Sequence, residues 1–505
     1  MEIIKSKIIF SFKEAKLYLL ILILFSSVVF FANLWEGDLG LDSCAYATIS
    51  RTILRTNDWV VPHYEYSDQL ADCFLHPPMF YWMTAISFKI FGINEFAARF
   101  VSAFLGFLTV ILVYFLTFII SRNHKTAFLS GFVLATTQPF LELGRKCQLD
   151  VPLAFFMTGA ILFFVLAINK NKKYYILYGI FTGLSILTKG IPALAVVAVS
   201  FLYLIFAKKF KELINGWFIL GNIIILLVIG SWITPLINVG KFNDFYINYI
   251  CGQILVNFTH GERQTTGIIN KVCGMFWYIK ELSRHYWPWI PFLIYSLYVY
   301  IKKMKATHNM LLLFVLWMAI ILLGFSAGQT KYFRYMAPIY PSFAVFIGLV
   351  YGEIITNKIF KKVLIFAICL ALVSLIATST FPLYFGKINS PDKTEIKKMT
   401  PYIRNLVKKE DTILNYRADY WGILADFSFY VDRRISRPYQ DENEFIKDLE
   451  QKKVFAFIDK TIYNDISANI KERCQIILQT ENSYFLISKE NFKTLKENLY
   501  PIYIY

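Results

Sequence analysis

Apolar runs of about 20 residues follow one another along most of this chain, and each is near the length that an α-helix needs to cross a bilayer. Hydrophobic residues make up 56% of the 505 residues and charged residues only 17%, against about 25% charged residues in an average soluble domain. We therefore predict a polytopic α-helical membrane protein with about 11–13 transmembrane helices. The runs lie at residues 17–34, 98–120, 126–143, 151–168, 174–188, 191–207, 215–237, 287–301, 310–327, 335–352 and 362–382.

Basic residues are grouped in short clusters between these runs. The net charge of +17 would suggest nucleic-acid binding in a soluble protein, but the sequence has no basic domain interleaved with aromatic residues. Loops rich in Lys and Arg face the cytoplasm, so the clusters predict a cytoplasmic N-terminus, an extracytoplasmic C-terminal region and no nucleic-acid partner. The clusters lie at residues 5–16, 122–125, 170–173, 208–211, 302–305 and 358–362.

The segment 35–76 is acidic instead, and we expect it on the outer side. The apolar segment 77–92 resembles a further span, but counting it would move the basic cluster at 122–125 to the outside. We therefore predict an amphipathic helix that lies on the outer membrane interface. The long outer loop then covers residues 35–97.

The chain changes character after residue 385, where charges rise and apolar runs shorten. Helical patterns alternate there with short β runs, including 412–416 and the paired runs 474–480 and 483–489. This alternation predicts a small α/β domain of about 110 residues outside the membrane. We expect two domains, a transmembrane domain at 1–385 that carries the long outer loop and a soluble domain at 386–505.

Ionisable residues near the ends of the runs gather on the predicted outer side. Such residues are costly close to lipid, so each of them suggests a function. Carboxylates can accept a proton from an attacking hydroxyl, and cations can stabilise a departing phosphate. The set comprises Asp42, Asp150, Lys189, Arg263, Lys331 and Arg334.

Spacing alone leaves a structural alternative open for three of these residues. Asp42 is also a good helix N-cap. Asp150 precedes Val151 and Pro152, which is an ordinary helix start. Lys189 lies between two short runs, where a lysine can extend its charged end to the interface.

Histidines on the predicted outer side raise the question of a metal. Their spacing matches no zinc pattern, and the seven Cys include no CxxC pair. No cofactor is therefore assigned, and a divalent cation is the alternative that stays open. The histidines are His63, His76, His260 and His285.

Six short motifs resemble, in order and spacing, those of the polyprenyl-phosphate-sugar-dependent glycosyltransferases of the GT-C superfamily. The nearest kin are the lipid A aminoarabinose transferases and enzymes similar to protein mannosyltransferases. The resemblance covers residues 35–207 and 260–352. The motifs are Asp42–Tyr46, His76–Trp82, Phe91–Arg99, Arg145–Ala154, Leu187–Gly190 and Lys331–Pro341.

The resemblance implies a GT-C fold and an inverting transfer of a sugar from a polyprenyl-phosphate donor to an envelope acceptor: lipid A, another glycolipid or a protein. It implies the bacterial inner membrane as the location. Asp42 is then the base and Asp150 its partner. The substrate-binding residues are His76, Tyr81, Lys189, Arg263, Lys331 and Tyr335.

Two positions depart from the family pattern. His76 replaces the lysine that precedes the two prolines and would bind the donor phosphate, and Ser43 replaces a glutamate. Histidine needs help to stay charged at neutral pH, so phosphate binding shifts toward Arg263, Lys189 and Lys331. The alternative function is a transporter or flippase of lipid-linked substrates, although the sequence shows no internal repeat.

Overall fold

The chain folds into two compact units, one formed by residues 1–36 and 74–389 and the other by residues 37–73 and 390–505. We keep the functional division at residue 385 as a proposal, and note that the segment 37–73 packs with the tail. The computed structural model describes residues 2–66, 69–256, 268–304, 309–328, 330–380, 395–409, 411–417, 425, 427–451, 454–479 and 483–496.

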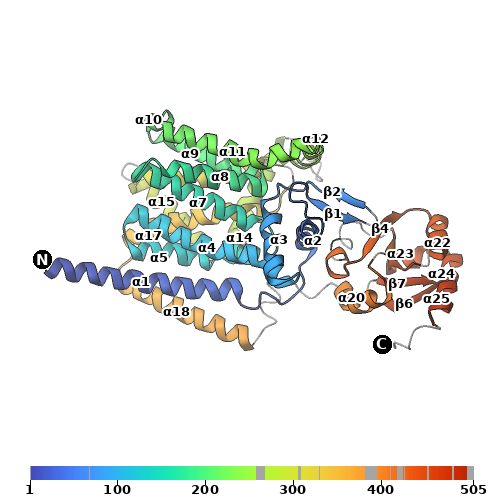
Figure 1. The fold of residues 1–505 in the computed structure, drawn as a ribbon. Helices are drawn as coiled ribbons and strands as arrows, with labels where there is room; N and C mark the ends of the chain where they lie inside the picture. The colour runs from blue at the N-terminus through green and yellow to red at the C-terminus, as the bar shows by residue number, and fades with distance from the viewer. Residues whose placement is uncertain are drawn as a thin grey trace. The chain divides into compact units, whose positions relative to one another are not determined.

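The first unit is a bundle of helices whose long members lie side by side (Figure 1). A core of large apolar side chains fills the space between them. The elements are α1 (Glu2–Phe31), α3 (Met79–Phe91), α4 (Glu95–Ser121), α5 (His124–Ala135), α6 (Gln138–Gly144), α7 (Asp150–Asn169), α8 (Tyr174–Lys189), η1 (Ile191–Leu194), α9 (Ala195–Phe206), α10 (Phe210–Leu213), α11 (Gly216–Asn238), α12 (Phe242–Phe245), η2 (Tyr246–Leu255), α14 (Ile268–His285), α15 (Ile290–Val299), η3 (Tyr300–Met304), α16 (Asn309–Ala327), η4 (Phe333–Ile339), α17 (Tyr340–Ile354) and α18 (Asn357–Thr380).

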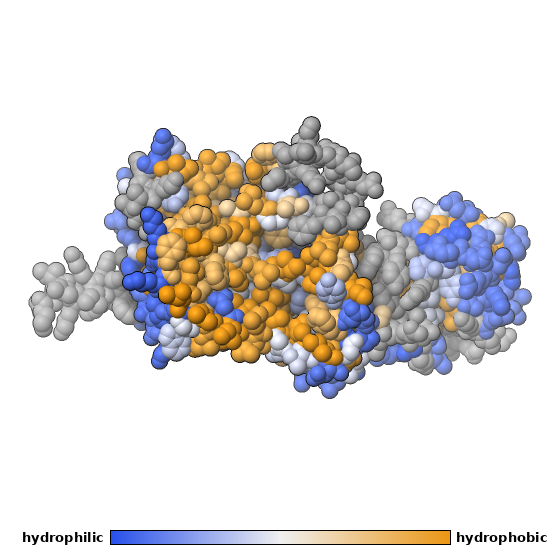
Figure 2. Space-filling model, turned by 90° about the horizontal axis from the view of Figure 1, so that it is seen from above, coloured by the Kyte–Doolittle hydropathy of each residue, from blue (hydrophilic) through white to orange (hydrophobic). Residues whose placement is uncertain are grey.

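Helices occupy most of each predicted apolar run, which confirms the polytopic α-helical class, and the run 126–143 is divided between α5 and α6. Within the described residues, five are long and apolar enough to cross a bilayer: Glu95–Ser121, Asp150–Asn169, Gly216–Asn238, Met310–Ala327 and Phe333–Ile354. The apolar helical stretches Lys16–Phe31, Ile191–Phe206 and Ile290–Lys302 are shorter. Apolar residues cover most of the face of this unit seen in Figure 2, as expected of a surface in contact with lipid.

Helix α3 covers the segment for which the sequence predicts an interfacial helix. Its 13 residues span about 20 Å at the α-helical rise, which is well short of the ~30 Å hydrocarbon core. The helix itself is confirmed, and its position at the membrane interface remains a prediction.

Two buried arginines from the sequence motifs have a structural role. Arg145 donates to the carbonyl oxygens of Val29 (3.0 Å) and Ala32 (2.5 Å) at the end of α1. Arg99 donates to the carbonyl of Leu34 at 2.9 Å, and its side chain is fully buried. Backbone carbonyl groups at and just after the C-terminal end of a helix have no hydrogen-bond donor within the helix. These two guanidinium groups donate the missing hydrogen bonds inside the protein.

Helices α5 and α17 approach each other closely because glycines of α17 face small polar residues of α5. A Cβ added at Gly348 would lie 1.9 Å from Ser130 Oγ, and one at Gly352 would lie 2.1 Å from Thr126 Oγ1. Small residues spaced four positions apart in sequence commonly allow two helices to pack closely in a membrane.

The second unit combines a helix and a hairpin from the segment 37–73 with an α/β fold formed by the tail. The hairpin strands pair antiparallel, with His63 opposite Asp72. The tail sheet has the order β4-β3-β5-β7-β6, parallel from β4 to β5 and antiparallel beyond it. The elements are α2 (Leu41–Thr56), β1 (His63–Tyr66), β2 (Gln69–Asp72), α20 (Glu395–Leu406), β3 (Thr412–Tyr416), β4 (Arg434–Tyr439), α22 (Glu442–Gln451), β5 (Ala456–Asp459), α23 (Lys460–Asp465), α24 (Ala468–Arg473), β6 (Cys474–Gln479), β7 (Ser483–Ser488) and α25 (Lys489–Lys496).

The sheet confirms the predicted α/β tail, including its paired last strands. Strand β4 was not predicted, because Pro438 interrupts its β pattern. Its place at the edge of the sheet explains why a proline is tolerated there.

The close packing of α5 and α17 can be tested with Gly348→Ala. We expect a fall in melting temperature of the detergent-solubilised protein, because overpacking a tight contact costs about 1–3 kcal/mol. Gly230→Ala in α11 is the matched control, since an added Cβ there meets no atom within 4 Å. Equal melting temperatures for the two variants would contradict the packing.

Candidate functional site

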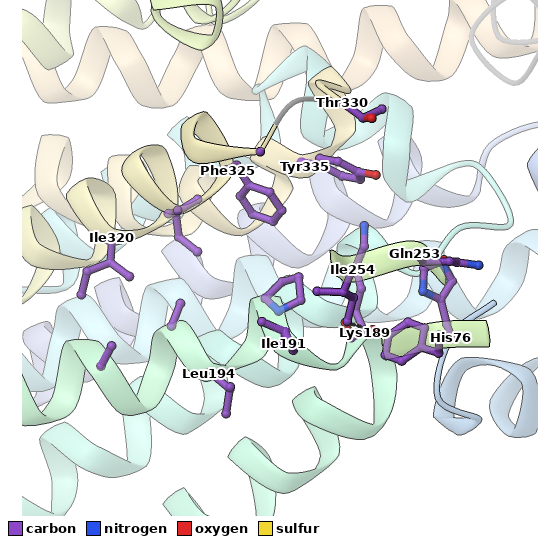
Figure 3. A pocket seen from close by; sticks show the side chains of 17 residues that line it. His76, Lys189, Ile191, Leu194, Gln253, Ile254, Ile320, Phe325, Thr330 and Tyr335 are labelled. Atoms are coloured by element: carbon purple, nitrogen blue, oxygen red, sulfur yellow. Dashed lines mark hydrogen bonds between the residues drawn. The ribbon is translucent and has the colours of Figure 1, made fainter. Parts of the chain in front are cut away.

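A cavity of about 340 Å³ lies in the first unit. Its lining comes from the loop before α3, the end of α8, η1 and α9, the π-helical segment η2, α16, and η4 with the loop before it (Figure 3). Segments far apart in sequence therefore build one site.

The cavity has an apolar half and a polar end. Ile320 and Leu194 lie at one end in Figure 3, whereas Lys189, His76 and Tyr335 gather at the other. Such an arrangement suits an amphiphile with a long apolar chain and a charged head.

Lys189 forms a buried ion pair with Asp150 beside the polar end. The side chains are only 7% and 3% exposed. Asp150 is the first residue of α7, and Lys189 is the last residue of α8. A buried charge is stable only when it is paired, so each residue fixes the other.

The pairing settles two alternatives that the sequence left open. Asp150 does begin a helix, as its spacing suggested, but it is also buried and paired. The interpretation of Lys189 as a lysine that extends to the interface is wrong, because its ammonium group is buried against a carboxylate.

The backbone at Lys189 is held by Tyr249 of η2. The Tyr249 hydroxyl donates to the Lys189 carbonyl oxygen at 2.8 Å. Gly190 follows with φ +64°, and a Cβ added there would lie 2.2 Å from the same hydroxyl. Glycine is therefore required in this motif both for its left-handed φ and for the close approach of Tyr249.

Tyr335 and Arg334 complete the polar end. The Lys189 ammonium lies 4.6 Å from the centroid of the Tyr335 ring, and the Arg334 guanidinium lies 6.0 Å from the same centroid. Both distances suit cation–π attraction. The two cations and the one carboxylate Asp150 leave an excess positive charge that favours an anionic ligand.

His76 lines the cavity, with its ring edge-on to Tyr249 at a centroid distance of 6.0 Å. Burial lowers the pKa of His76 well below 6.5, and the positive charges of Lys189 and Arg334 lower it further. The imidazole is therefore neutral at pH 7. The position where the sequence motif leads us to expect a cation thus carries a neutral hydrogen-bonding group.

Other predicted site residues lie elsewhere. Lys331 donates to the carbonyls of Ser326 (3.0 Å) and Gly328 (2.6 Å) at the C-terminal end of α16 and does not line the cavity. Burial lowers the pKa of Lys331. Tyr81 is buried in α3 and is also absent from the cavity lining. Arg263 and His260 lie outside the described residues.

Asp42 belongs to the second unit, in the first turn of α2. The N-cap residue of this helix is Gly40, so the alternative that Asp42 is the N-cap is wrong. A carboxylate in the first turn still interacts favourably with the helix dipole. Its side chain is half-buried.

The cavity also contains residues that the sequence did not indicate. Tyr249 and Gln253 lie between the predicted runs 215–237 and 287–301, where no motif or charge pattern marks them. Among the described residues, no group of three or more His, Cys, Asp or Glu side chains could hold a metal ion.

Comparison with known proteins gives a family for part of the chain. Residues 75–234 match the family model described as dolichyl-phosphate-mannose-protein mannosyltransferase. An uncharacterized protein of Aquifex aeolicus is 26% identical over 364 residues, which are 71% of this chain and 68% of that protein.

An aminoarabinose transferase of Yersinia enterocolitica is 29% identical to this chain over 313 residues. Its full name is undecaprenyl phosphate-alpha-4-amino-4-deoxy-L-arabinose arabinosyl transferase. The match covers 60% of this chain and 53% of that enzyme, so the chain spans about half the length of the aminoarabinose transferases it matches.

Solved structures show the fold. ArnT from Cupriavidus metallidurans bound to undecaprenyl phosphate matches with a TM-score of 0.74 at 15% sequence identity. The match covers 93% of this chain and 98% of the ArnT chain. The Archaeoglobus fulgidus oligosaccharyltransferase matches with a TM-score of 0.56 at 14% sequence identity, over 89% of this chain and 70% of the oligosaccharyltransferase chain. The chain is thus a membrane protein of the GT-C fold that resembles the polyprenyl-phosphate-sugar glycosyltransferases, the aminoarabinose transferases among them.

Proposed function

We propose that this protein transfers a sugar from a polyprenyl-phosphate carrier to an envelope acceptor. The observation that carries the proposal is the cavity, which is apolar along one half and ends at the buried cation of Lys189. A polyprenyl phosphate has the same division into a long apolar chain and an anionic head. The undecaprenyl phosphate bound to the similarly folded ArnT supports the same ligand class.

The residues at the polar end would hold the donor phosphate. Lys189 and Arg334 supply positive charge, and the Tyr335 hydroxyl can donate a hydrogen bond. His76 contributes a neutral donor. Lys331 and Tyr81 remain in the proposal because of their motifs, and Arg263 remains because of its predicted place on the outer side.

In the proposed reaction, Asp42 takes the proton of an acceptor hydroxyl. The hydroxyl oxygen forms a bond to the anomeric carbon, and the bond from that carbon to the phosphate oxygen breaks with inversion. The electron pair of the broken bond leaves with the lipid phosphate, whose added charge the cations stabilise. Asp150 assists, since its carboxylate fixes Lys189.

The acceptor is proposed as a lipid or a peptide. The motif resemblance to the lipid A aminoarabinose transferases supports a lipid. The archaeal oligosaccharyltransferase solved with an inhibitory peptide and a dolichol-phosphate supports a peptide. We place the protein in the bacterial inner membrane, with its N-terminus in the cytoplasm and its C-terminal domain outside, from the distribution of Lys and Arg. None of the relatives reported above has a name that describes a transporter, so these comparisons do not support the flippase alternative.

The proposed base can be tested with Asp42→Asn in membranes that contain a radiolabelled polyprenyl-phosphate sugar. We expect transfer to fall by about 10²–10⁴-fold, because a positioned base contributes that much to the rate. Binding of the polyprenyl phosphate should be unchanged. Full transfer activity in the variant would overturn the assignment of Asp42, and no transfer by the native protein would overturn the function.

The apolar half of the cavity can be tested with Gly324→Leu. An added Cβ at Gly324 meets no atom within 4 Å, so the leucine fills the cavity without a backbone clash. We expect KM for a long-chain donor to rise about tenfold, a loss of about 1.4 kcal/mol, with a smaller rise for a short-chain donor. Gly230→Leu is the control, since Gly230 also has open space but lies outside the cavity. An unchanged KM would show that the chain binds elsewhere.

His76 gives a pH prediction. Because its pKa is lowered, the imidazole is neutral at pH 7 and takes up a proton only when an anion binds or the pH falls. Affinity for polyprenyl phosphate should therefore increase from pH 8 to pH 5 more steeply in the native protein than in His76→Gln. His76→Lys should bind about tenfold more tightly than the native protein at pH 8, with a flatter profile. The phosphate's own titration is common to all three proteins, so parallel profiles would exclude a role for His76 in holding the phosphate.

A further inference from the structure

The second unit contains an arrangement that the proposed reaction does not use. Four tail residues, Ser428, Phe429, Tyr430 and Asp432, contact the chain just before α2 and the C-terminal half of α2, the helix that carries Asp42. We refer to residues 428–432 as the clamp segment. These residues are almost 400 positions from the helix in sequence, yet they belong to the same compact unit.

The N-terminal end of α2 is held through Tyr430. The backbone N–H of Leu39, three residues before Asp42, donates to the Tyr430 hydroxyl at 2.8 Å in a buried contact. The neighbouring Asp38, whose side chain is 4% exposed, pairs with Lys397 at 3.2 Å. The Lys397 ammonium in turn lies 5.5 Å from the centroid of the Tyr430 ring.

The C-terminal half of α2 is held through its two arginines. Arg51, whose side chain is 3% exposed, donates to the carbonyls of Ser428 at 2.8 Å and Phe429 at 3.2 Å. It also pairs with the Asp432 carboxylate at 3.1 Å, and Arg55 reaches the same oxygen at 2.5 Å. Charge-assisted bonds of this kind fix geometry more strongly than neutral bonds do.

Between these contacts the helix has little freedom to shift. Residues 43–53 of α2 are buried without a break, so the helix is packed on all sides rather than lying on a surface. Asp432 itself adopts a left-handed backbone conformation, with φ +56°. The clamp segment therefore holds the chain just before α2 and the C-terminal half of the helix.

We infer that Tyr430 and Asp432 are positioning residues for Asp42, and that the tail unit holds the proposed base in its working position. The inference rests on the proposed function. A base must lie within hydrogen-bond reach of its proton, and a displacement of about 1 Å can cost about 10²-fold in rate. A shift at Leu39 would be passed along the chain to Asp42.

The test is Tyr430→Phe, which removes one oxygen atom and no apolar surface. We expect kcat to fall about tenfold while KM for the donor stays within about twofold, because the donor cavity is lined by the other unit. The matched control is Tyr439→Phe. This substitution removes another tail hydrogen bond, from the Tyr439 hydroxyl to Asp448 at 2.6 Å, and should leave kcat unchanged.

A double-mutant cycle separates positioning from general stability. If Tyr430 acts through Asp42, Tyr430→Phe should lower the residual rate of Asp42→Asn by less than twofold. A tenfold loss in that background would overturn the inference. Asp432→Asn supplies a second variant, with the same expectation, should Tyr430→Phe not yield folded protein.

The outcomes distinguish this inference from the function on which it rests. Native protein without transfer activity overturns the proposed function. A different set of results would overturn only the positioning role and leave the function in place. In that case the native protein is active, the Asp42→Asn variant is inactive, and the Tyr430→Phe variant keeps the native kcat.

Discussion

The buried pair of Lys189 and Asp150 is the interaction on which the site depends. Neither charge is stable in an apolar surrounding without the other, so the start of α7 and the end of α8 must meet. The pair lies where the cavity changes from apolar to polar. Tyr249 from η2 and Tyr335 from η4 contact Lys189 and hold it at the polar end of the cavity.

The proximity of these two residues could be predicted from sequence. One span begins at Asp150, and after a short basic turn a second span ends at Lys189. The two spans are therefore antiparallel, and both residues lie at the same end of this helix pair. Hydropathy alone places such spans. The helices at the predicted runs and the paired strands of the tail follow from the same local patterns.

The remaining parts of the site depend on contacts that one sequence does not encode locally. Any of several carboxylates could have paired with Arg51, and its partner Asp432 is nearly 400 residues away. Arg99 and Arg145 stand in motifs that suggest chemistry, but they donate to backbone carbonyls in the last turn of α1 and just after it. His76 shows the same limit, because its charge state depends on two cations brought close by folding.

An experimental structure with a bound polyprenyl phosphate tests the central claim most directly. The account predicts the phosphate within hydrogen-bond distance of the Lys189 ammonium and the isoprenoid chain in the cavity between α9 and α16. A phosphate bound far from Lys189, with the cavity empty of the chain, would contradict it.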